Sequence, residues 1–199
     1  MQSNPVVWFE IYVQDMDRAK RFYETVLGTT LTKLPSGVSA GLAMGLAFMT
    51  TGVAFKIAAV PFHYWTPDAY QGSPTPITGY LSVGPKVGAF ALMIKLFLFA
   101  LLPLASTWVP IIAVLAAATM TLGNLVALTQ GNVKRMLAYS SIAHTGYLMV
   151  GIVAAGSGDA SGVSAILFYA AAYAFMNLGA FAVLSAVGVS VGASSRSGR

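Results

Sequence analysis

The stretch "GVAFKIAAVPFHYWTPDAYQG", residues 52–72, is an apolar run that carries Lys56, His63 and Asp68 and that two prolines interrupt. A proline inside a helix removes a backbone hydrogen-bond donor, so the groups around it cannot all bond within the helix. At membrane depth such irregular backbone is tolerated only where protein buries it or where it lines a wet cavity. We therefore predict a broken membrane helix here. An ordinary loop between two spans is the alternative.

The composition of the whole chain is that of a membrane protein. Hydrophobic residues make up 57% of it and charged residues 9%, against roughly 25% charged in an ordinary soluble domain. Four long intervals carry no charge: 34 to 55, 96 to 133, 136 to 158 and 160 to 195. Each can hold the stretch of about 20 apolar residues that crosses a hydrocarbon core. Several helical spans are expected.

The charge and the cysteine count exclude other classes of protein. The formal net charge is +5, but the basic residues are scattered beside or within apolar runs, so we expect no nucleic-acid partner. The chain has 0 cysteines, which excludes disulfides, thiolate zinc sites and cysteine-ligated iron–sulfur clusters on it. We expect no metal site and no catalytic residue. The N-terminus does not have the pattern of a signal peptide.

From residue 38 onward the pattern predicts an all-α polytopic membrane protein with about five transmembrane helices. The first is broken and resumes as a half-helix to about residue 72. The predicted segments are 38 to 62, 76 to 102, 108 to 130, 134 to 156 and 162 to 188. Residues 189–199 are predicted to be a flexible tail. Glycines recur at helix-packing spacing, namely Gly37, Gly41 and Gly45 in the first segment and Gly84 and Gly88 in the second. They predict close helix contacts, unless they only reflect how common glycine is in such helices.

The first 37 residues have a different composition. Of the 17 charged residues, eight lie within the first 33 positions. Residues 5–13 predict a strand, and residues 15–28 predict a helix that Asp15 caps and Gly28 ends. One strand and one helix cannot bury a core, so we treat residues 1–37 as a separate fragment.

The adjacent pair Lys134 and Arg135 predicts the orientation, because basic residues favour the cytoplasmic side. Arg196 then lies on the same side and Asp159 on the opposite side. With five spans the N-terminal fragment would lie outside the cell, although it carries no obvious export signal.

Three lysines fall within or beside the predicted spans. A charged lysine at mid-span costs roughly 2.5–3.5 kcal/mol on insertion scales, so such a residue normally faces a polar interior. We expect Lys56, before the break, and Lys86, in the middle of the second segment, to take up and release protons. Lys95 lies nine residues after Lys86 and thus on the opposite helix face, which indicates a structural or snorkelling role.

Two polar stripes run along the last two segments. Their members recur at helical spacing and are Ser140, His144 and Tyr147, then Tyr169, Tyr173 and Asn177. His144 titrates near neutral pH unless perturbed and could pass protons, or it could bond to a neighbouring helix. For the second stripe, hydrogen bonds between helices are the preferred interpretation. Asp68 could pair with a lysine or cap the half-helix.

Two motifs carry a family resemblance. "FKIAAVPFHYWTPDAYQGSPTPITGYLSVGPKVGAFA" and "GNLVALTQGNVKRMLAYSSIAHTGYLMVG" resemble the antiporter-like membrane subunits of the proton-pumping NADH:quinone oxidoreductase, complex I. The run "YQGSPTP" points to the subunit N group, and the resemblance covers residues 40 to 187. The large subunits of multisubunit cation/proton antiporters belong to the same wider family and give the alternative function.

The resemblance implies a proton path that contains Lys56, Lys86, His144 and Lys134. His63, Asp68, Lys95 and Tyr147 are possible supporting residues. It also implies a multi-pass protein of the bacterial inner membrane, with other complex I subunits and the lipid bilayer as partners. NADH, FMN, the iron–sulfur clusters and quinone would bind partner subunits and not this chain. Members of the family have about fourteen helices, so the helix with a partner glutamate and a later broken helix would lie outside this sequence.

The N-terminal run "NPVVWFEIYVQDMDRAKRFYETVLG" is similar to the opening strand and helix of the glyoxalase/bleomycin-resistance (vicinal oxygen chelate) superfamily. Glu10 lies near a metal-ligand position of that superfamily, but its other ligands are missing. The leading hypothesis is a fragment of a proton-translocating subunit joined near Pro35 to a piece of a soluble protein. A non-functional chimeric fragment, or a soluble metal enzyme on a membrane anchor, are the alternatives.

Overall fold

The computed structural model describes residues 16–28, residue 30 and residues 40–196, and the chain forms two units, Met1–Leu42 and Ala43–Arg199. In the first unit, helix α1 (Met16–Leu27) ends at Gly28, whose φ of +61° is the left-handed conformation that glycine adopts easily. This confirms the predicted helix and its end. Phe22 and Val26 of its apolar face are exposed. The predicted strand at residues 5–13 and the Asp15 cap lie outside the described residues.

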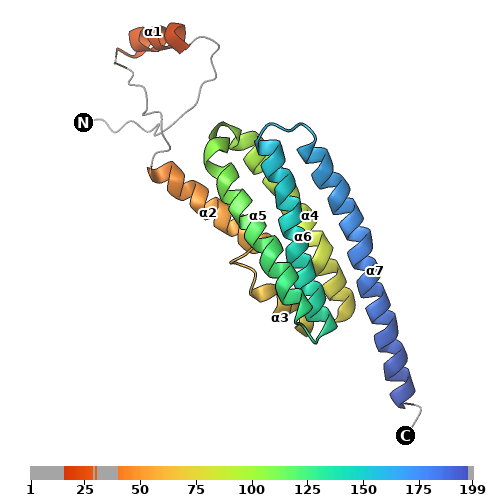
Figure 1. The fold of residues 1–199 in the computed structure, drawn as a ribbon. Helices are drawn as coiled ribbons and strands as arrows, with labels where there is room; N and C mark the ends of the chain where they lie inside the picture. Colours follow the sequence, from red (N-terminus) through yellow and green to blue (C-terminus); the bar gives the residue numbers. More distant parts are fainter. Residues whose placement is uncertain (1–15, 29, 31–39, 197–199) are drawn as a thin grey trace. The chain divides into compact units, whose positions relative to one another are not determined.

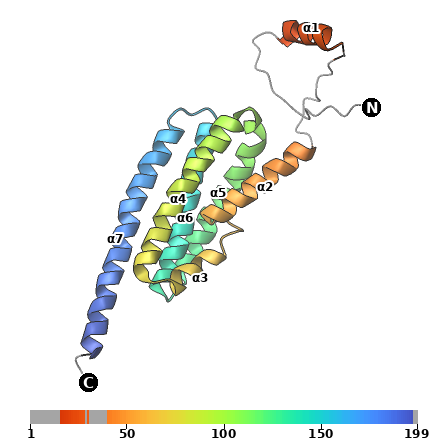
Figure 2. The same cartoon turned by 180° about the vertical axis from the view of Figure 1, so that it is seen from behind.

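The second unit is a helical bundle. Its long helices are α4 (Thr75–Lys95), α5 (Ala105–Leu128), α6 (Val133–Gly156) and α7 (Gly162–Arg196). They lie side by side in both views (Figures 1 and 2). A π-helical turn, η1 (Leu96–Ala100), extends α4, and a 3-10 turn, η2 (Leu102–Leu104), precedes α5. Among the described residues, 4 helices are long and apolar enough to cross a membrane, which confirms the second to fifth predicted segments.

The first predicted segment is the broken one. Helix α2 (Ala40–Ile57) ends at Ile57, irregular backbone follows, and the short helix α3 (Trp65–Gly72) resumes. The break begins at Ala58, which has a φ of +59°, and therefore before the prolines rather than at them. The apolar part of α2, Ala43–Ile57, is shorter than the other candidate spans. Four full-length spans are thus found in the described part of the chain.

Helix α7 continues to Arg196, beyond the predicted end of the fifth segment at residue 188. The backbone is therefore helical over most of the stretch that we expected to be a tail. Whether that stretch is flexible stays a prediction.

The core of the second unit joins α2, α4, α5 and α6. Phe97 of η1 and Trp108 of α5 are fully buried with their ring centroids 5.2 Å apart. The Trp108 indole nitrogen donates to the Leu101 carbonyl at 2.8 Å, which anchors the irregular turn between α4 and α5. Met93 and Ile112 belong to the same buried apolar cluster.

Close helix contacts occur at glycines other than those we predicted. A Cβ atom on Gly41, Gly45 or Gly88 would meet nothing within 4 Å, so these glycines do not mark helix contacts in the described part of the chain. A Cβ on Gly123 of α5 would instead lie 2.7 Å from the Ala143 backbone nitrogen of α6. Spacing alone does not distinguish a glycine that faces a neighbouring helix from one that faces outward.

Candidate functional site

Lys86 is the buried cation of the bundle. It lies eleven residues into α4, about 16 Å from its start at 1.5 Å per residue, and only 5% of it is exposed. Its ammonium donates to the backbone carbonyl and to the hydroxyl of Ser141 on α6. The same nitrogen lies 5.4 Å from the centroid of the Tyr173 ring on α7, within the range of a cation–π contact. Lys86 therefore faces the interior, as predicted, and contacts two neighbouring helices.

Ser141 connects Lys86 to a polar network on α7. Its hydroxyl lies 2.7 Å from the Tyr173 hydroxyl. Asn177 donates to the same tyrosine oxygen at 3.1 Å and to the hydroxyl of Ser82. All of these side chains are at most 5% exposed. The predicted hydrogen bonding of the α7 stripe between helices is thus confirmed, and the network joins α4, α6 and α7.

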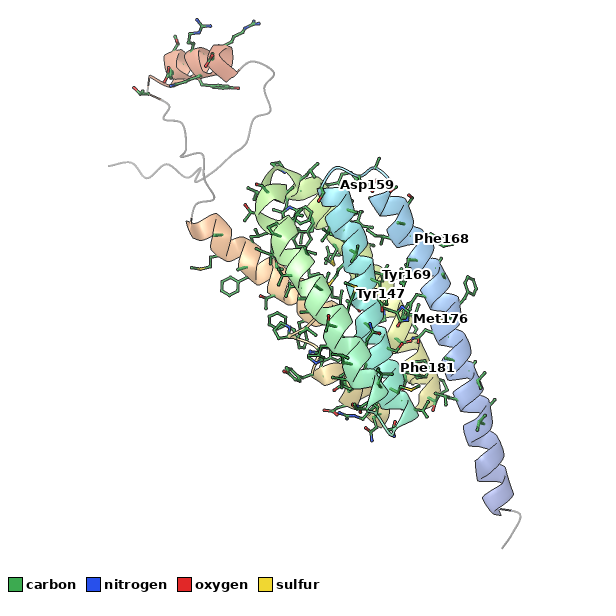
Figure 3. All side chains as sticks on the ribbon, viewed as in Figure 1. Tyr147, Asp159, Phe168, Tyr169, Met176 and Phe181 are labelled. Carbon is green, nitrogen blue, oxygen red and sulfur yellow. The ribbon has the colours of Figure 1, made fainter. Side chains whose placement is uncertain are left out.

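His144 lies next to this network on α6. Its Nδ1 atom is 2.6 Å from the Tyr169 hydroxyl, and its ring centroid lies 5.0 Å from that of Tyr173. Tyr147, one turn further along, accepts a hydrogen bond from Asn124 of α5 at 2.8 Å. Figure 3 shows Tyr147 and Tyr169 where α6 and α7 run side by side. His144 thus bonds to a neighbouring helix and also lies beside the lysine network, so both predicted interpretations remain compatible.

The start of the helix break is buried, and two threonines from other helices hydrogen-bond to its backbone. The Val60 backbone N–H donates to the Thr119 hydroxyl of α5 at 3.0 Å. The Thr145 hydroxyl of α6 lies 3.0 Å from the Ile57 carbonyl and 3.2 Å from the Ser141 carbonyl. Ala58 and Ala59 are buried, whereas Pro61 and Tyr64 are exposed, so protein encloses the start of the irregular backbone, as is required at membrane depth. Neither threonine was predicted.

Lys56 and Lys95 lie away from this network. Both side chains are exposed, and neither makes a hydrogen bond or ion pair to a residue that the structure describes. For Lys95 this agrees with its expected position on the opposite face of α4 from Lys86. Lys56 is in the last turn of α2, and the structure does not bring it to Lys86.

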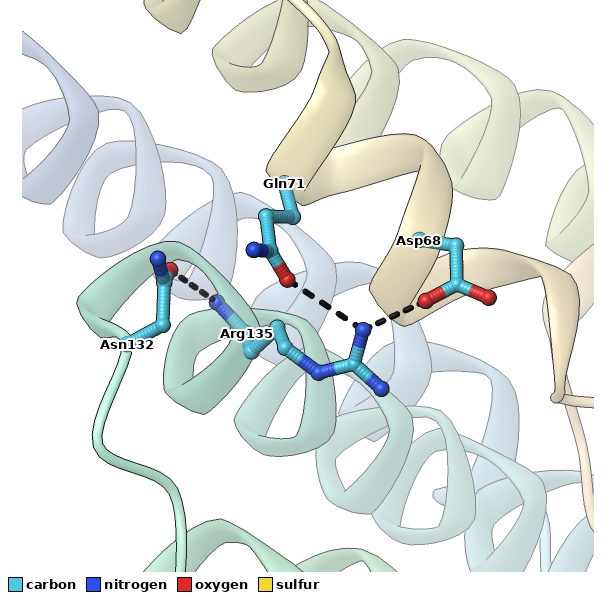
Figure 4. Close-up of polar contacts among 4 residues, drawn as sticks. All are labelled: Asp68, Gln71, Asn132 and Arg135. Carbon is cyan, nitrogen blue, oxygen red and sulfur yellow. Dashed lines mark hydrogen bonds and ion pairs between the residues drawn. The ribbon is translucent and has the colours of Figure 1, made fainter.

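A second polar cluster joins α3 to the start of α6 (Figure 4). Arg135 forms an ion pair with Asp68 and donates to the Gln71 amide oxygen at 3.2 Å. Lys134 donates to the Ser73 carbonyl at 2.9 Å, and the Asn132 side chain caps α6 by accepting from the Arg135 backbone at 3.2 Å. Among the described residues Asp68 has neither predicted role: it pairs with Arg135 rather than with a lysine, and no side chain caps α3. The Arg135 side chain is 31% exposed and comes from the start of α6.

His63 is 2% exposed and stacks on Tyr64, with ring centroids 4.4 Å apart. Its Nδ1 atom and the hydroxyl of buried Thr66 have no hydrogen-bond partner among the described residues. Buried polar atoms of this kind commonly bond to ordered water. Within the described residues no group of His, Asp and Glu side chains could hold a metal ion.

The buried residues that sequence reasoning missed are Ser141, Thr145, Thr119 and Ser82. Ser141 and Thr145 are four residues apart on α6 and therefore lie on one face. That spacing was the available signal, but the predicted stripe used Ser140, the neighbour of the residue that bonds Lys86. Small hydroxyl residues are common in membrane helices, so their pattern did not distinguish the buried ones.

Comparison with known proteins shows which proteins the chain resembles. Residues 24–197 match the family described as NADH:quinone oxidoreductase/Mrp antiporter, TM. The chain is 50% identical over 162 residues to NADH-quinone oxidoreductase subunit N of Trichlorobacter lovleyi, covering 81% of this chain and 33% of that protein. It is 50% identical over 164 residues to NAD(P)H-quinone oxidoreductase subunit 2 of Rippkaea orientalis, covering 81% of this chain and 31% of that protein.

A solved structure is also similar. One chain of respiratory complex I from Thermus thermophilus with bound aureothin is 38% identical, with a TM-score of 0.59, and the match covers 84% of this chain and 36% of that chain. The chain thus spans about a third of the length of the relatives it matches.

Proposed function

Because the chain belongs to the NADH:quinone oxidoreductase/Mrp antiporter family of membrane proteins, we propose that it acts as a membrane part of a proton-translocating NADH:quinone oxidoreductase, complex I. In this role Lys86 carries protons at the middle of the membrane. The observation that carries the proposal is the burial of Lys86 at mid-span with Ser141 as its hydrogen-bond acceptor. A buried charge without a role would be costly at that depth.

The groups around Lys86 suit proton transfer. The hydroxyls of Ser141 and Tyr173 can each donate one hydrogen bond and accept another, and the neutral imidazole of His144 has one donor and one acceptor nitrogen. In the proposed path, protons move between Lys86 and His144 through these hydroxyls. The Ser141 and Tyr173 hydroxyls lie 2.7 Å apart, within the reach of about 2.6–3.2 Å that proton exchange needs, whereas the rings of Tyr173 and His144 are in contact with their centroids 5.0 Å apart.

Lys56 and Lys134 extend the proposed path toward the rest of the protein and toward the surface. Lys56 precedes Ile57 in the sequence, and the Ile57 carbonyl accepts a hydrogen bond from the Thr145 hydroxyl. The same hydroxyl also bonds to the Ser141 carbonyl, which links the end of α2 to the acceptor of Lys86. Lys134 lies at the start of α6, where it holds the end of α3. His63, Asp68 and Tyr147 are proposed to support the path by positioning its helices. Lys95, which the sequence also offered for this role, is exposed and away from the network and is expected to contribute little.

We propose that the redox chemistry lies on partner subunits. NADH, FMN, the iron–sulfur clusters and quinone would bind there, and the chain would lie as a multi-pass protein in the bacterial inner membrane beside other complex I subunits. The break and α2 would provide the fifth membrane segment. A cation/proton antiporter subunit is the alternative, since the matched family includes both kinds of protein.

The test is a pair of lysine substitutions in membranes that contain the assembled complex. Lys86→Met keeps the length of the side chain and removes the charge, and NADH-driven acidification of inverted vesicles should fall at least tenfold. Lys95→Met is the matched control on the exposed face of the same helix and should keep most of the activity. Equal activity of both variants would refute the proposal. Proton release driven by a cation gradient without NADH would favour the antiporter.

The separate origin of residues 1–37 in a glyoxalase-like protein is also a proposal. The change of composition near Pro35 supports it. Sequencing the genomic DNA across the junction tests it: two separate genes would mean that the chimera is not real. If the fused chain is made but never assembles with other subunits, the alternative of a non-functional chimeric fragment holds.

A further inference from the structure

Asn177 is a buried amide of α7 that the proposed proton path does not use. Only 5% of it is exposed, and it lies one helical turn after Tyr173, on the same face of α7. Its side-chain nitrogen donates to the Ser82 hydroxyl of α4 and, at 3.1 Å, to the Tyr173 hydroxyl. Asn177 therefore bonds directly to one of the two hydroxyls of that path.

The hydrogen bonds of Ser82 determine which way the Asn177 amide faces. The Ser82 hydroxyl has one proton, and it donates that proton to the Gly79 carbonyl at 2.7 Å. Toward Asn177 the Ser82 oxygen can therefore only accept, so the part of the amide that faces it is the NH2 group and not the oxygen. The second hydrogen of this NH2 group is then free for the Tyr173 oxygen, and the amide offers the Tyr173 proton no acceptor there.

The proton of Tyr173 consequently points to Ser141. Two acceptors lie near it, the Ser141 hydroxyl oxygen at 2.7 Å and the Ser82 carbonyl at 3.3 Å. The shorter distance is the usual one for a hydrogen bond between hydroxyls, about 2.7–2.8 Å, whereas the longer one is beyond the usual range. The Ser141 oxygen then accepts from both Tyr173 and Lys86, which occupies both of its acceptor positions.

The hydroxyl proton of Ser141 is the one that can change its partner. The Tyr70 hydroxyl of α3 lies 3.3 Å from the Ser141 oxygen and can receive this proton while Lys86 is charged. An ammonium group has no acceptor position, but when Lys86 loses a proton its nitrogen gains a lone pair. The Ser141 hydroxyl can then turn to that nitrogen while Tyr173 continues to donate to Ser141.

We propose that Asn177 is a positioning residue for proton transfer at Lys86. Its amide holds the Tyr173 proton on Ser141, so that the Ser141 hydroxyl alone turns when Lys86 gains or loses a proton. The reorganisation that accompanies each transfer is thereby limited to one hydroxyl, and dipoles that are already in place lower the barrier. The inference rests on the proposed function of Lys86, and Asn177 itself neither gains nor loses a proton.

Asn177→Leu tests this role in membranes that contain the assembled complex. The leucine fills a similar volume and donates no hydrogen bond, so the Tyr173 hydroxyl is free to turn to the Ser82 carbonyl. NADH-driven acidification of inverted vesicles is measured in H2O and in D2O and normalised to the amount of subunit. Met176→Leu is the matched control, because Met176 precedes Asn177 on α7 and is 55% exposed (Figure 3).

We expect the rate of Asn177→Leu in H2O to fall at least threefold. The ratio of its rates in H2O and D2O should exceed the wild-type ratio, because proton transfer then limits the overall rate. Met176→Leu should keep both wild-type values. Ser82→Ala provides a second measurement if Asn177→Leu does not assemble, since it removes the group that fixes the amide and should change the rate and the isotope ratio in the same directions.

A wild-type rate in Asn177→Leu would overturn the positioning role. A lower rate with an unchanged isotope ratio would also overturn it, since a side chain that only holds helices together would have that effect. Lys86→Met, measured beside it, separates this failure from that of the proposed function. Loss of activity in Lys86→Met with a wild-type rate in Asn177→Leu overturns the role of Asn177 alone, whereas full activity in Lys86→Met overturns both.

Discussion

The substitution Ser141→Ala tests the link between Lys86 and α7. It removes the hydroxyl that accepts from the Lys86 ammonium and lies 2.7 Å from the Tyr173 hydroxyl. The Ser141 backbone carbonyl remains as an acceptor for Lys86, so the lysine keeps one partner. The variant therefore interrupts the proton path and leaves the lysine buried.

Ser141→Ala should slow proton transfer strongly while it lowers the stability of the folded protein only slightly. Interhelical hydrogen bonds in membranes contribute on average about 0.6 kcal/mol to stability, so the folded protein should remain abundant. A hydrogen bond to a charged group contributes about 1.5–3 kcal/mol. If proton transfer needs that bond, the rate should fall by about 10-fold to 100-fold, since about 1.4 kcal/mol corresponds to a factor of ten.

The assay is NADH-driven acidification of inverted membrane vesicles, followed with a pH-sensitive dye and normalised to the amount of subunit on an immunoblot. Ser140→Ala is the matched control, because Ser140 precedes Ser141 on the same helix and makes no hydrogen bond to a described residue. It should keep the wild-type rate. If both variants pump equally well, the Ser141 hydroxyl is not part of the path and the reasoning fails.

Three further predictions concern stability. Gly123→Ala places a Cβ 2.7 Å from a backbone atom of α6 and should lower the free energy of unfolding by about 1–3 kcal/mol. Gly88→Ala is the control, because a Cβ there meets open space, and it should change the free energy of unfolding little. Chemical denaturation in detergent measures both. Asp68→Asn removes the exposed ion pair to Arg135 and should lower the melting temperature slightly at low salt, with no difference left at about 1 M salt, where charges are screened within about 3 Å. Hydrogen bonds from Ser161 hold the pKa of Asp159 below its ordinary value of 3.8, so the carboxylate stabilises its turn above that pH and loses this effect as the pH falls through the lower folded value. In the wild type, the protection of the turn amides, measured as hydrogen exchange relative to the intrinsic rate at each pH, should fall at the acid end. The same pH dependence of protection in Asp159→Asn and the wild type would contradict this.

The sequence predicted the helices well because apolar runs of spanning length are a strong signal. It predicted the buried position of Lys86 for a physical reason as well, since the residue is central and its nine-residue spacing from Lys95 places the two on opposite faces. The break was predicted from prolines. Its actual start at Ala58 depends on Thr119 and Thr145, which satisfy the backbone from two other helices, and such tertiary partners leave no mark in the local sequence.

Contacts between helices were the weakest part of the sequence interpretation. The partner of Asp68 is Arg135, 67 residues away in sequence, and no local pattern indicates such a distant pair. The same holds for Ser141 rather than Ser140 as the acceptor for Lys86. Choosing between adjacent residues needs the rotation of each helix about its axis, and that rotation is set by packing at contacts such as Gly123 against Ala143.

Helix α6 joins three polar features of the second unit. Its start holds α3 through Arg135, and its middle supports the break through Thr145 and receives Lys86 at Ser141. A rigid displacement of α6 along its axis would therefore move the acceptor of Lys86 and the support of the break by the same amount. A shift of α6 would thus be felt at the buried lysine and at the break together.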